Sequence, residues 1–175
     1  MRPAVTLFAV GFALASWASC GSASAFEREW HVGAALGAST GQGLELSPAL
    51  GAYAAYGLSD TFDARFEVTA RGYHLMSDLD PNALSASVGV AYKLDVLRWV
   101  PWAGAYVGYL GFLEAPRPDL AFTQHDATIG IGLGLDYAFS RQLGAGVTLR
   151  YDDALSRAET STFDALLRAE YRWGW

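Results

Sequence analysis

Cysteine is almost absent from this 175-residue sequence, and its cations form no cluster. The single cysteine, Cys20, lies within the first 25 residues, so a chain processed after residue 25 has no disulfide, no thiol chemistry and no cysteine-based zinc site. The formal net charge is −6, and the 12 lysines and arginines are scattered along the chain. Binding to nucleic acid through its phosphates is therefore not expected.

Charge is scarce, and long apolar runs are missing after the first 25 residues. Charged residues make up 17% of the chain, against about a quarter in an ordinary soluble protein. Hydrophobic residues reach 52% and aromatic residues 14%, which is not the composition of a disordered chain or a coiled coil. After Phe26 no apolar run is long enough for a membrane-spanning helix, and no stretch has a helical period.

The first 25 residues have the features of an export signal. Arg2 supplies the positive start, Ala4 to Ala18 form the apolar stretch, and Ala23-Ser24-Ala25 is a small-residue cleavage site. Two alternatives remain open, an uncleaved membrane anchor and a lipoprotein whose mature chain begins at Cys20. We expect a signal peptide over residues 1–25 and one domain over residues 26–175.

Beyond the leader, apolar and polar residues alternate as they do in β-strands with two different faces. In the last such stretch Phe163 and Leu167 share one face, while Asp164 and Arg168 share the other. Short, turn-rich connectors separate the stretches, which predicts hairpins throughout and a closed, antiparallel up-and-down barrel. The eight expected strands cover residues 28–39, 46–58, 62–75, 84–95, 101–113, 122–139, 143–154 and 162–175.

Glycine and charge indicate that the polar face lines the inside of this barrel. An eight-stranded lumen is barely wide enough for side chains, so its lining must be small. Cations facing lipid at the bilayer midplane cost about 2–4 kcal/mol each. The pattern therefore predicts an eight-stranded transmembrane β-barrel with an apolar exterior, and disfavours a soluble ligand-binding barrel. The polar face holds glycines 33, 37, 51, 57, 89, 130, 132, 134, 144, 146 and 174, and the strand cations Arg65, Arg71, Lys93, Arg150, Arg168 and Arg172.

The fifth expected strand is ambiguous. Gly104 and Gly108 share a face with Trp102, Tyr106 and Leu110. Small and large residues therefore lie on one side, and the pattern does not say whether that side faces lipid or the lumen.

Aromatic residues of the apolar face gather at strand ends beside the short connectors. Membrane barrels carry such girdles where the bilayer meets water. We therefore expect an aromatic girdle at one membrane interface, made of Trp30, Tyr56, Phe62, Tyr92, Tyr137 and Phe139, with Trp173 and Trp175 of the last strand beside it.

These features resemble the small outer-membrane β-barrels of Gram-negative bacteria, of the opacity-protein and OmpA transmembrane-domain type. The resemblance covers about residues 27–175. It rests on the closing Tyr171-Arg172-Trp173-Gly174-Trp175, and on Tyr56-Gly57-Leu58-Ser59-Asp60 and Tyr137-Ala138-Phe139-Ser140, which resemble the family's periplasmic turns. No chain follows Trp175, so we do not expect the peptidoglycan-binding domain of longer relatives.

The resemblance also implies a location and partners. It implies an outer-membrane location, contact with outer-membrane lipids and lipopolysaccharide, and insertion by the barrel assembly machinery. Tyr171, Trp173 and Trp175 would form the assembly signal. The connectors at the opposite end are short for a large adhesive surface, and their acids could bridge through divalent cations to lipopolysaccharide phosphates. These acids are Glu45, Asp78, Asp80, Glu114, Asp119, Asp153 and Glu159.

Charges of both signs on the inward face predict an ion-pair network in the lumen. Alternating charges two residues apart lie about 7 Å from each other along one strand. The network could be a plug that holds the barrel shut and gives it a structural, envelope-integrity role, or it could line a narrow channel for ions or small solutes. The narrow lumen favours the plug. Its predicted members are Asp63, Arg65, Glu67, Arg71, Arg150, Asp152, Asp164, Arg168, Glu170 and Arg172.

A lipid-modifying enzyme is a further alternative, since lipid A deacylases belong to the barrels that the chain resembles. Those enzymes use a lipid-facing histidine, a serine two residues on, and an acid on the next strand. Here His125 faces lipid, but Ala127 follows it, and Thr123 is a poor substitute. Asp153 is expected opposite Ile129, about 13 Å from His125 and beyond hydrogen-bond reach. We therefore predict no catalytic residue, and no cofactor or metal site either.

The terminal aromatic row generates a prediction about assembly. Deleting Trp175, or changing Trp173 and Trp175 to Asp, should block insertion because it destroys the terminal signal. Cell fractionation should then find the protein in the periplasm or degraded. Normal surface levels of these variants would contradict the assignment.

Overall fold

The structure is a computed structural model that describes residues 29–41, 44–72, 82–94, 98–112, 125–156 and 161–174. The expected leader with Cys20 lies outside these ranges, and so does Trp175. Within them there is no helix long and apolar enough to cross a membrane. The strands are β1 (Trp30–Gly41), β2 (Leu44–Gly57), β3 (Phe62–Gly72), β4 (Asn82–Lys93), β5 (Trp99–Phe112), β6 (His125–Ala138), β7 (Leu143–Ala154) and β8 (Ser161–Trp173).

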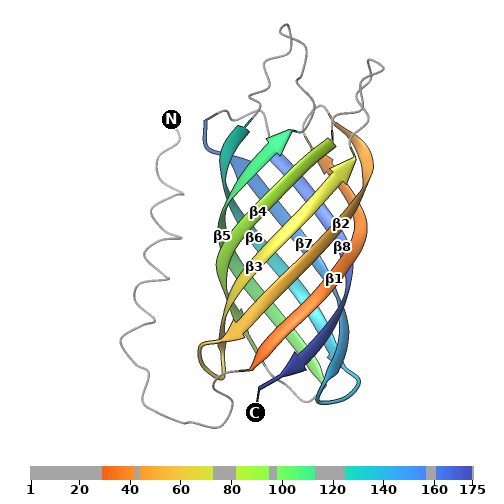
Figure 1. Cartoon of the computed structure of the whole chain (residues 1–175), viewed down its shortest axis with the longest axis vertical. Coiled ribbons are helices and arrows are strands. Elements are labelled where there is room, and N and C mark those ends of the chain that lie inside the picture. The colour runs from red at the N-terminus through yellow and green to blue at the C-terminus, as the bar shows by residue number, and fades with distance from the viewer. Residues whose placement is uncertain are drawn as a thin grey trace, which may run out of the picture.

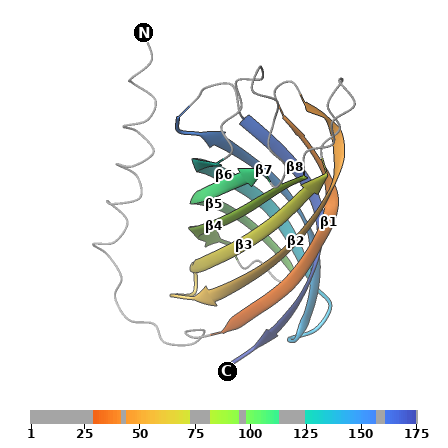
Figure 2. The ribbon, with the colours of Figure 1, turned by 45° about the horizontal axis from the view of Figure 1, so that its top comes forward.

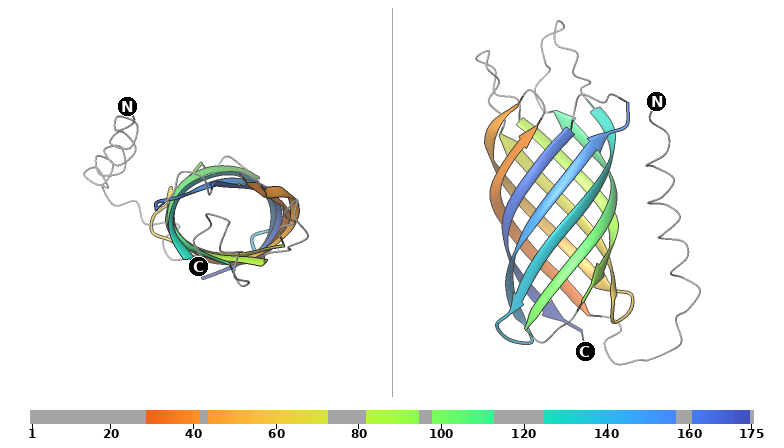
Figure 3. Two further views of the ribbon diagram at one scale, coloured as in Figure 1. Left: turned by 90° about the horizontal axis from the view of Figure 1, so that it is seen from above. Right: turned by 180° about the vertical axis from the view of Figure 1, so that it is seen from behind.

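The eight strands form one closed sheet. Each pairs antiparallel with the strand before it, and β8 pairs with β1, with Trp30 opposite Trp173 (Figure 1). Seen from above, the strands form a closed ring, and from the side they run obliquely around it (Figure 3). The predicted eight-stranded up-and-down barrel is confirmed.

The barrel is apolar outside and charged inside. Ile131 and Leu167 are each 60% exposed on the outer surface. Arg71 is 2% exposed and Arg168 is 5% exposed, and both point into the lumen. A soluble barrel would have the reverse arrangement, so the predicted orientation of the two faces is correct and the outer surface is suited to lipid.

Strand β5 begins two residues earlier than expected, at Trp99 rather than Pro101. Proline favours a strand start because it has no N–H to donate to the ladder. The carbonyl of Pro101 accepts from the Leu94 N–H at 2.9 Å, just past the end of β4. A strand residue directs its N–H and C=O to the same neighbour. The N–H that Pro101 lacks would therefore point past the end of β4. No hydrogen bond to a residue of β4 is lost, and β5 continues through the proline.

Two tight turns close hairpins at the end of the barrel where β1 begins and β8 ends, which we call the turn end. In the β2–β3 turn the Leu58 N–H donates to the Phe62 carbonyl at 2.8 Å, and in the β6–β7 turn the Phe139 N–H donates to the Leu143 carbonyl at 3.0 Å. In each turn a serine hydroxyl, that of Ser59 or Ser140, accepts the backbone N–H of the first residue of the following strand. Figure 2 shows both turns at the same end of the barrel.

The orientation of the faces predicts the effect of one substitution. Ile131→Arg should destabilise the inserted barrel by about 2–4 kcal/mol, because it places a cation against lipid near the middle of β6. Ile131→Leu, which keeps the surface apolar, is the matched control. Insertion and thermal unfolding in micelles measure the effect, and an arginine variant that inserts as well as the leucine variant would refute the lipid-facing assignment.

Candidate functional site

The lumen gathers all ten residues predicted for the ion-pair network. Eight are buried, and Glu67 and Arg172 are half-buried. They separate into a group at the far end of the barrel, away from the tight turns, and a group at the turn end. Several pairs join strands that are not neighbours in the sheet, so the contacts cross the lumen itself.

In the far-end group two arginines span the barrel. Arg71 on β3 makes a bidentate contact with Asp164 on β8, with Nε–Oδ1 at 2.9 Å and Nη2–Oδ2 at 2.5 Å. Arg150 on β7 donates to Glu67 on β3 at 2.6 Å and to Asp152 on its own strand at 2.8 Å. These bonds tie β3 to the opposite wall of the barrel.

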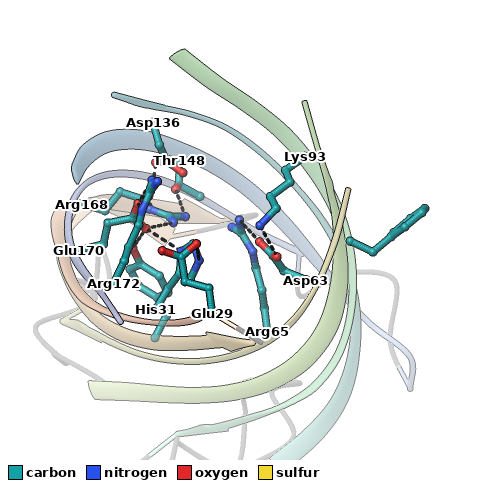
Figure 4. A network of polar contacts seen from close by, with 12 residues as sticks. Glu29, His31, Asp63, Arg65, Lys93, Asp136, Thr148, Arg168, Glu170 and Arg172 are labelled. Atoms are coloured by element: carbon teal, nitrogen blue, oxygen red, sulfur yellow. Dashed lines mark hydrogen bonds and ion pairs between the residues drawn. The ribbon is translucent and has the colours of Figure 1, made fainter. Parts of the chain in front are cut away.

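In the turn-end group Glu170 on β8 accepts from several donors (Figure 4). It accepts from the hydroxyl of Tyr53 on β2 at 2.7 Å, from Arg168 at 3.3 Å and from Arg172. His31 of β1 lies between this carboxylate and that of Glu29, with its nitrogens 3.7 Å and 3.3 Å from the two. The carboxylate of Glu170 thus holds together side chains from three strands.

A second carboxylate of the turn end, that of Asp63, contacts cations of β3 and β4. Asp63 lies 2.9 Å from Nζ of Lys93 and 3.6 Å from Nη2 of Arg65 (Figure 4). The Arg65 guanidinium stacks on the ring of Trp102 at 3.8 Å from the centroid. Its Nε and Nη1 have no hydrogen-bond partner among the described residues. Asp136, which Arg168 approaches at 3.2 Å, is a further acid of this group.

Three aromatic residues fill much of the remaining lumen. They are not among the residues that the sequence predicts to lie there. Trp102 and Tyr106 of β5 are 4% and 2% exposed, and Tyr53 of β2 is also buried. The guanidiniums of Arg150 and Arg168 lie 4.4 Å and 4.2 Å from the Tyr106 and Tyr53 ring centroids. Such stacking contributes about 0.5–2 kcal/mol when desolvated. The ambiguous face of β5 is therefore the inner face.

Glycines make room for these rings. A Cβ on Gly134 would lie 2.2 Å from the Trp102 ring, and one on Gly89 would lie 2.5 Å from the Tyr106 ring. A Cβ on Gly33 would meet the Tyr53 ring at 2.4 Å. The signal that could have placed Trp102 inside was present in the sequence, as the run of glycines on the inward face of β6.

Between the two charged groups the described residues line a small cavity. A small cavity of about 20 Å³ is lined by Tyr53, Glu67, Thr69, Thr148 and Arg168 together with small apolar residues. That volume accommodates about one water molecule. The side chains around it can satisfy a water, but the cavity is too small for a solute.

The predicted girdle residues lie at the turn end, where their rings meet across strands. Trp30 lies 4.9 Å from Tyr56 and 6.5 Å from Trp173, and Tyr171 lies 5.9 Å from Trp173. On other strands Phe62 contacts Tyr92 at 5.3 Å, and Tyr137 contacts Phe139 at 5.2 Å. Trp99, which is not one of the predicted girdle residues, has its ring centroid 4.8 Å from that of Tyr137. The last residue of the predicted assembly signal, Trp175, is outside the described residues.

Comparison with known proteins identifies solved structures with the same fold. The sequence matches no protein-family model and no curated protein. Solved structures do match. Neisserial surface protein A has 16% identity over 85% of this chain and 97% of its own, with a TM-score of 0.64. The N-terminal β-barrel domain of OprF from Pseudomonas aeruginosa has 17% identity over 84% and 98%, with a TM-score of 0.61. The outer membrane enzyme PagL has 18% identity over 80% and 97%, with a TM-score of 0.56.

This chain has the fold of the small outer-membrane β-barrels. The predicted resemblance is thereby confirmed for the fold, and because these identities are low the likeness extends no further. One of these neighbours is an enzyme. The side chains around His125, the lipid-facing histidine of this chain, therefore matter for whether it could take part in catalysis.

The surroundings of His125 contain no catalytic arrangement among the described residues. His125 is exposed on the outer surface, where its ring stacks on Tyr109 with centroids 5.7 Å apart. Asp153 pairs with Ile129 in the register of β6 and β7, four residues from His125, as the length of the β6–β7 turn predicts. Thr123 lies outside the described residues. Within those residues no group of three or more potential ligands could hold a metal ion.

The fit between glycines and rings yields a testable consequence. Gly134→Ala should destabilise the barrel by about 1–3 kcal/mol, because its Cβ overlaps the Trp102 ring. Gly51→Ala is the matched control, since its Cβ would find its nearest neighbour at 3.3 Å. Trp102→Phe should restore part of the stability lost in Gly134→Ala. Thermal unfolding in micelles measures all three, and equal losses for the two alanine variants would show that the ring does not occupy this niche.

Proposed function

We propose that the protein is a non-enzymatic outer-membrane barrel whose lumen is closed by ion pairs and whose role is structural, in the integrity of the cell envelope. The single observation that carries the proposal is the set of bonds across the lumen, Arg71–Asp164 and Arg150–Glu67 above all. They occupy the space that a solute would need, and the rings of Trp102 and Tyr106 fill more of it.

Several features support the outer-membrane location. The exterior is apolar, aromatic rings gather at the turn end, and structural neighbours of this chain are outer-membrane proteins. The partners that follow are outer-membrane lipids and lipopolysaccharide, with the barrel assembly machinery during insertion. Export by a signal peptide over residues 1–25 belongs to the same proposal. Most of the acids proposed to bridge to lipopolysaccharide lie outside the described residues, and Asp153 is the one whose side chain is described.

A narrow channel is the second candidate, and one observation favours it. The cavity beside Glu67 and Arg168 has room for a water molecule, and the buried Nε and Nη1 of Arg65 have no hydrogen-bond partner among the described residues. A chain of waters through these points would conduct ions weakly. A lipid-modifying activity has less support, because Ala127 stands where a serine would be required.

Conductance of the reconstituted barrel separates the plug from the channel. The wild type should be silent in planar bilayers. Glu170→Ala should open a conductance and cost about 3–5 kcal/mol if the lumen stays dry, because Glu170 is the one partner of Arg172 among the described ion pairs. Glu67→Ala should have a smaller effect, because Arg150 keeps Asp152.

Asp153→Ala removes an acid from the outer face and serves as the control. A wild type that conducts steadily, and whose conductance the lumen variants leave unchanged, would replace the plug with the channel. The structural role itself is tested by deleting the gene and measuring sensitivity to detergents. The role would be supported if the deletion strain is sensitive and if the wild-type protein, but not Ile131→Arg, restores its resistance. A deletion without effect on the envelope would contradict it.

A further inference from the structure

Two arginines stand apart from the other cations of this barrel. Of the lysines and arginines that the structure describes, Arg65, Arg71, Lys93, Arg150, Arg168 and Arg172 point into the lumen. The two others, Arg98 and Arg141, are exposed. The lumen network uses neither of them.

Both exposed arginines lie on one sector of the turn end. Arg98 directly precedes β5, and its carbonyl accepts from the N–H of Ala138, the last residue of β6, at 2.8 Å. Arg141 lies in the β6–β7 turn, two residues beyond Phe139. The sector formed by β5, β6 and β7 therefore carries two guanidiniums outside the lumen.

Below the guanidiniums lies a cluster of aromatic rings. Trp99 and Phe139 are 54% and 63% exposed, and Tyr137 stands between them, with centroids 4.8 Å and 5.2 Å away. Nη1 of Arg98 lies 3.5 Å from the hydroxyl of Tyr137. Aromatic side chains with a polar tip favour the depth of the lipid headgroups. Arg98 is thus held at the level where lipid phosphates lie, and Arg141 lies in the turn that directly follows the cluster.

We propose that Arg98 and Arg141, with Trp99, Tyr137 and Phe139, form a binding site for the headgroup phosphate of an anionic phospholipid. Guanidinium groups bind phosphate oxygens in a bidentate manner, and the exposed Leu135 and Leu143 continue the surface toward the acyl chains. At the turn end of this sector no acid among the described residues faces outward, since Asp153 lies at the far end of β7, so the attraction is not cancelled locally. The site rests on the membrane location proposed above, but not on the closure of the lumen.

The opposite sector of the rim provides an internal comparison. There Trp30, Tyr56 and Trp173 form a similar group of rings, with no exposed cation among the described residues. Rings alone place the barrel at the correct depth. The guanidiniums would add selectivity for anionic lipid on the sector of β5, β6 and β7.

The test uses the full barrel in vesicles of phosphatidylcholine, with or without phosphatidylglycerol. Lipids that remain bound are counted by native mass spectrometry after extraction. The wild type should prefer phosphatidylglycerol, and each of Arg98→Gln and Arg141→Gln should reduce this preference by about fivefold. Arg117→Gln with Arg157→Gln is the matched control, since it removes the same charge from the connections that follow β5 and β7.

Three outcomes would decide the matter. Loss of preference in Arg98→Gln/Arg141→Gln but not in the control supports the site. An unchanged preference, or an equal loss in the control, overturns it. A heat-modifiability gel records insertion separately, so a wild type that fails to enter vesicles would count against the membrane role itself.

Discussion

An eight-stranded barrel has a lumen so narrow that a large ring inside it needs a small residue beside it on the neighbouring strand. The rings of Trp102, Tyr106 and Tyr53 lie where Gly134, Gly89 and Gly33 leave no Cβ. The glycines therefore set the shape of the interior, and the charged groups occupy the two regions on either side of the rings. The position of the rings and the division of the ion pairs into two groups both follow from this limit on space.

The narrow lumen also determines how its charges are neutralised. Guanidiniums removed from water are tolerated only with carboxylates and rings against them. Arg71 and Arg150 find their carboxylates on the opposite wall, because the lumen is no wider than two long side chains. Arg168 has two carboxylates, a hydroxyl and two rings around it. The Arg71–Asp164 and Arg150–Glu67 contacts tie together strands that are not paired in the sheet, so the interior reinforces the barrel across its diameter.

Alternation alone predicted most of the fold, and it predicted less of the site. Asp153 stands opposite Ile129, because the turn between Phe139 and Leu143 fixes the register. The partners inside the lumen depend instead on where the strands lie around the barrel, which a period of two does not encode. Arg65 thus stacks on Trp102 and approaches Asp63, while Glu67, two residues on, is bonded by Arg150 from across the lumen. Trp99 escaped prediction because Pro101 suggested a later strand start.

The same side chain type serves two environments in this protein, and the difference lies in what surrounds it. In the lumen each guanidinium meets carboxylates or rings of the protein, so none is available to a ligand from outside. At the rim Arg98 is exposed, and its side-chain partner among the described residues is a tyrosine hydroxyl. A chain with a net charge of −6 would repel anionic headgroups if its acids lay outside, yet in the strands most acids lie inside with their cations. On the sector of β5, β6 and β7 the described charges that face outward at the turn end are therefore those of Arg98 and Arg141, and the lipid contacts there can change without changing the core.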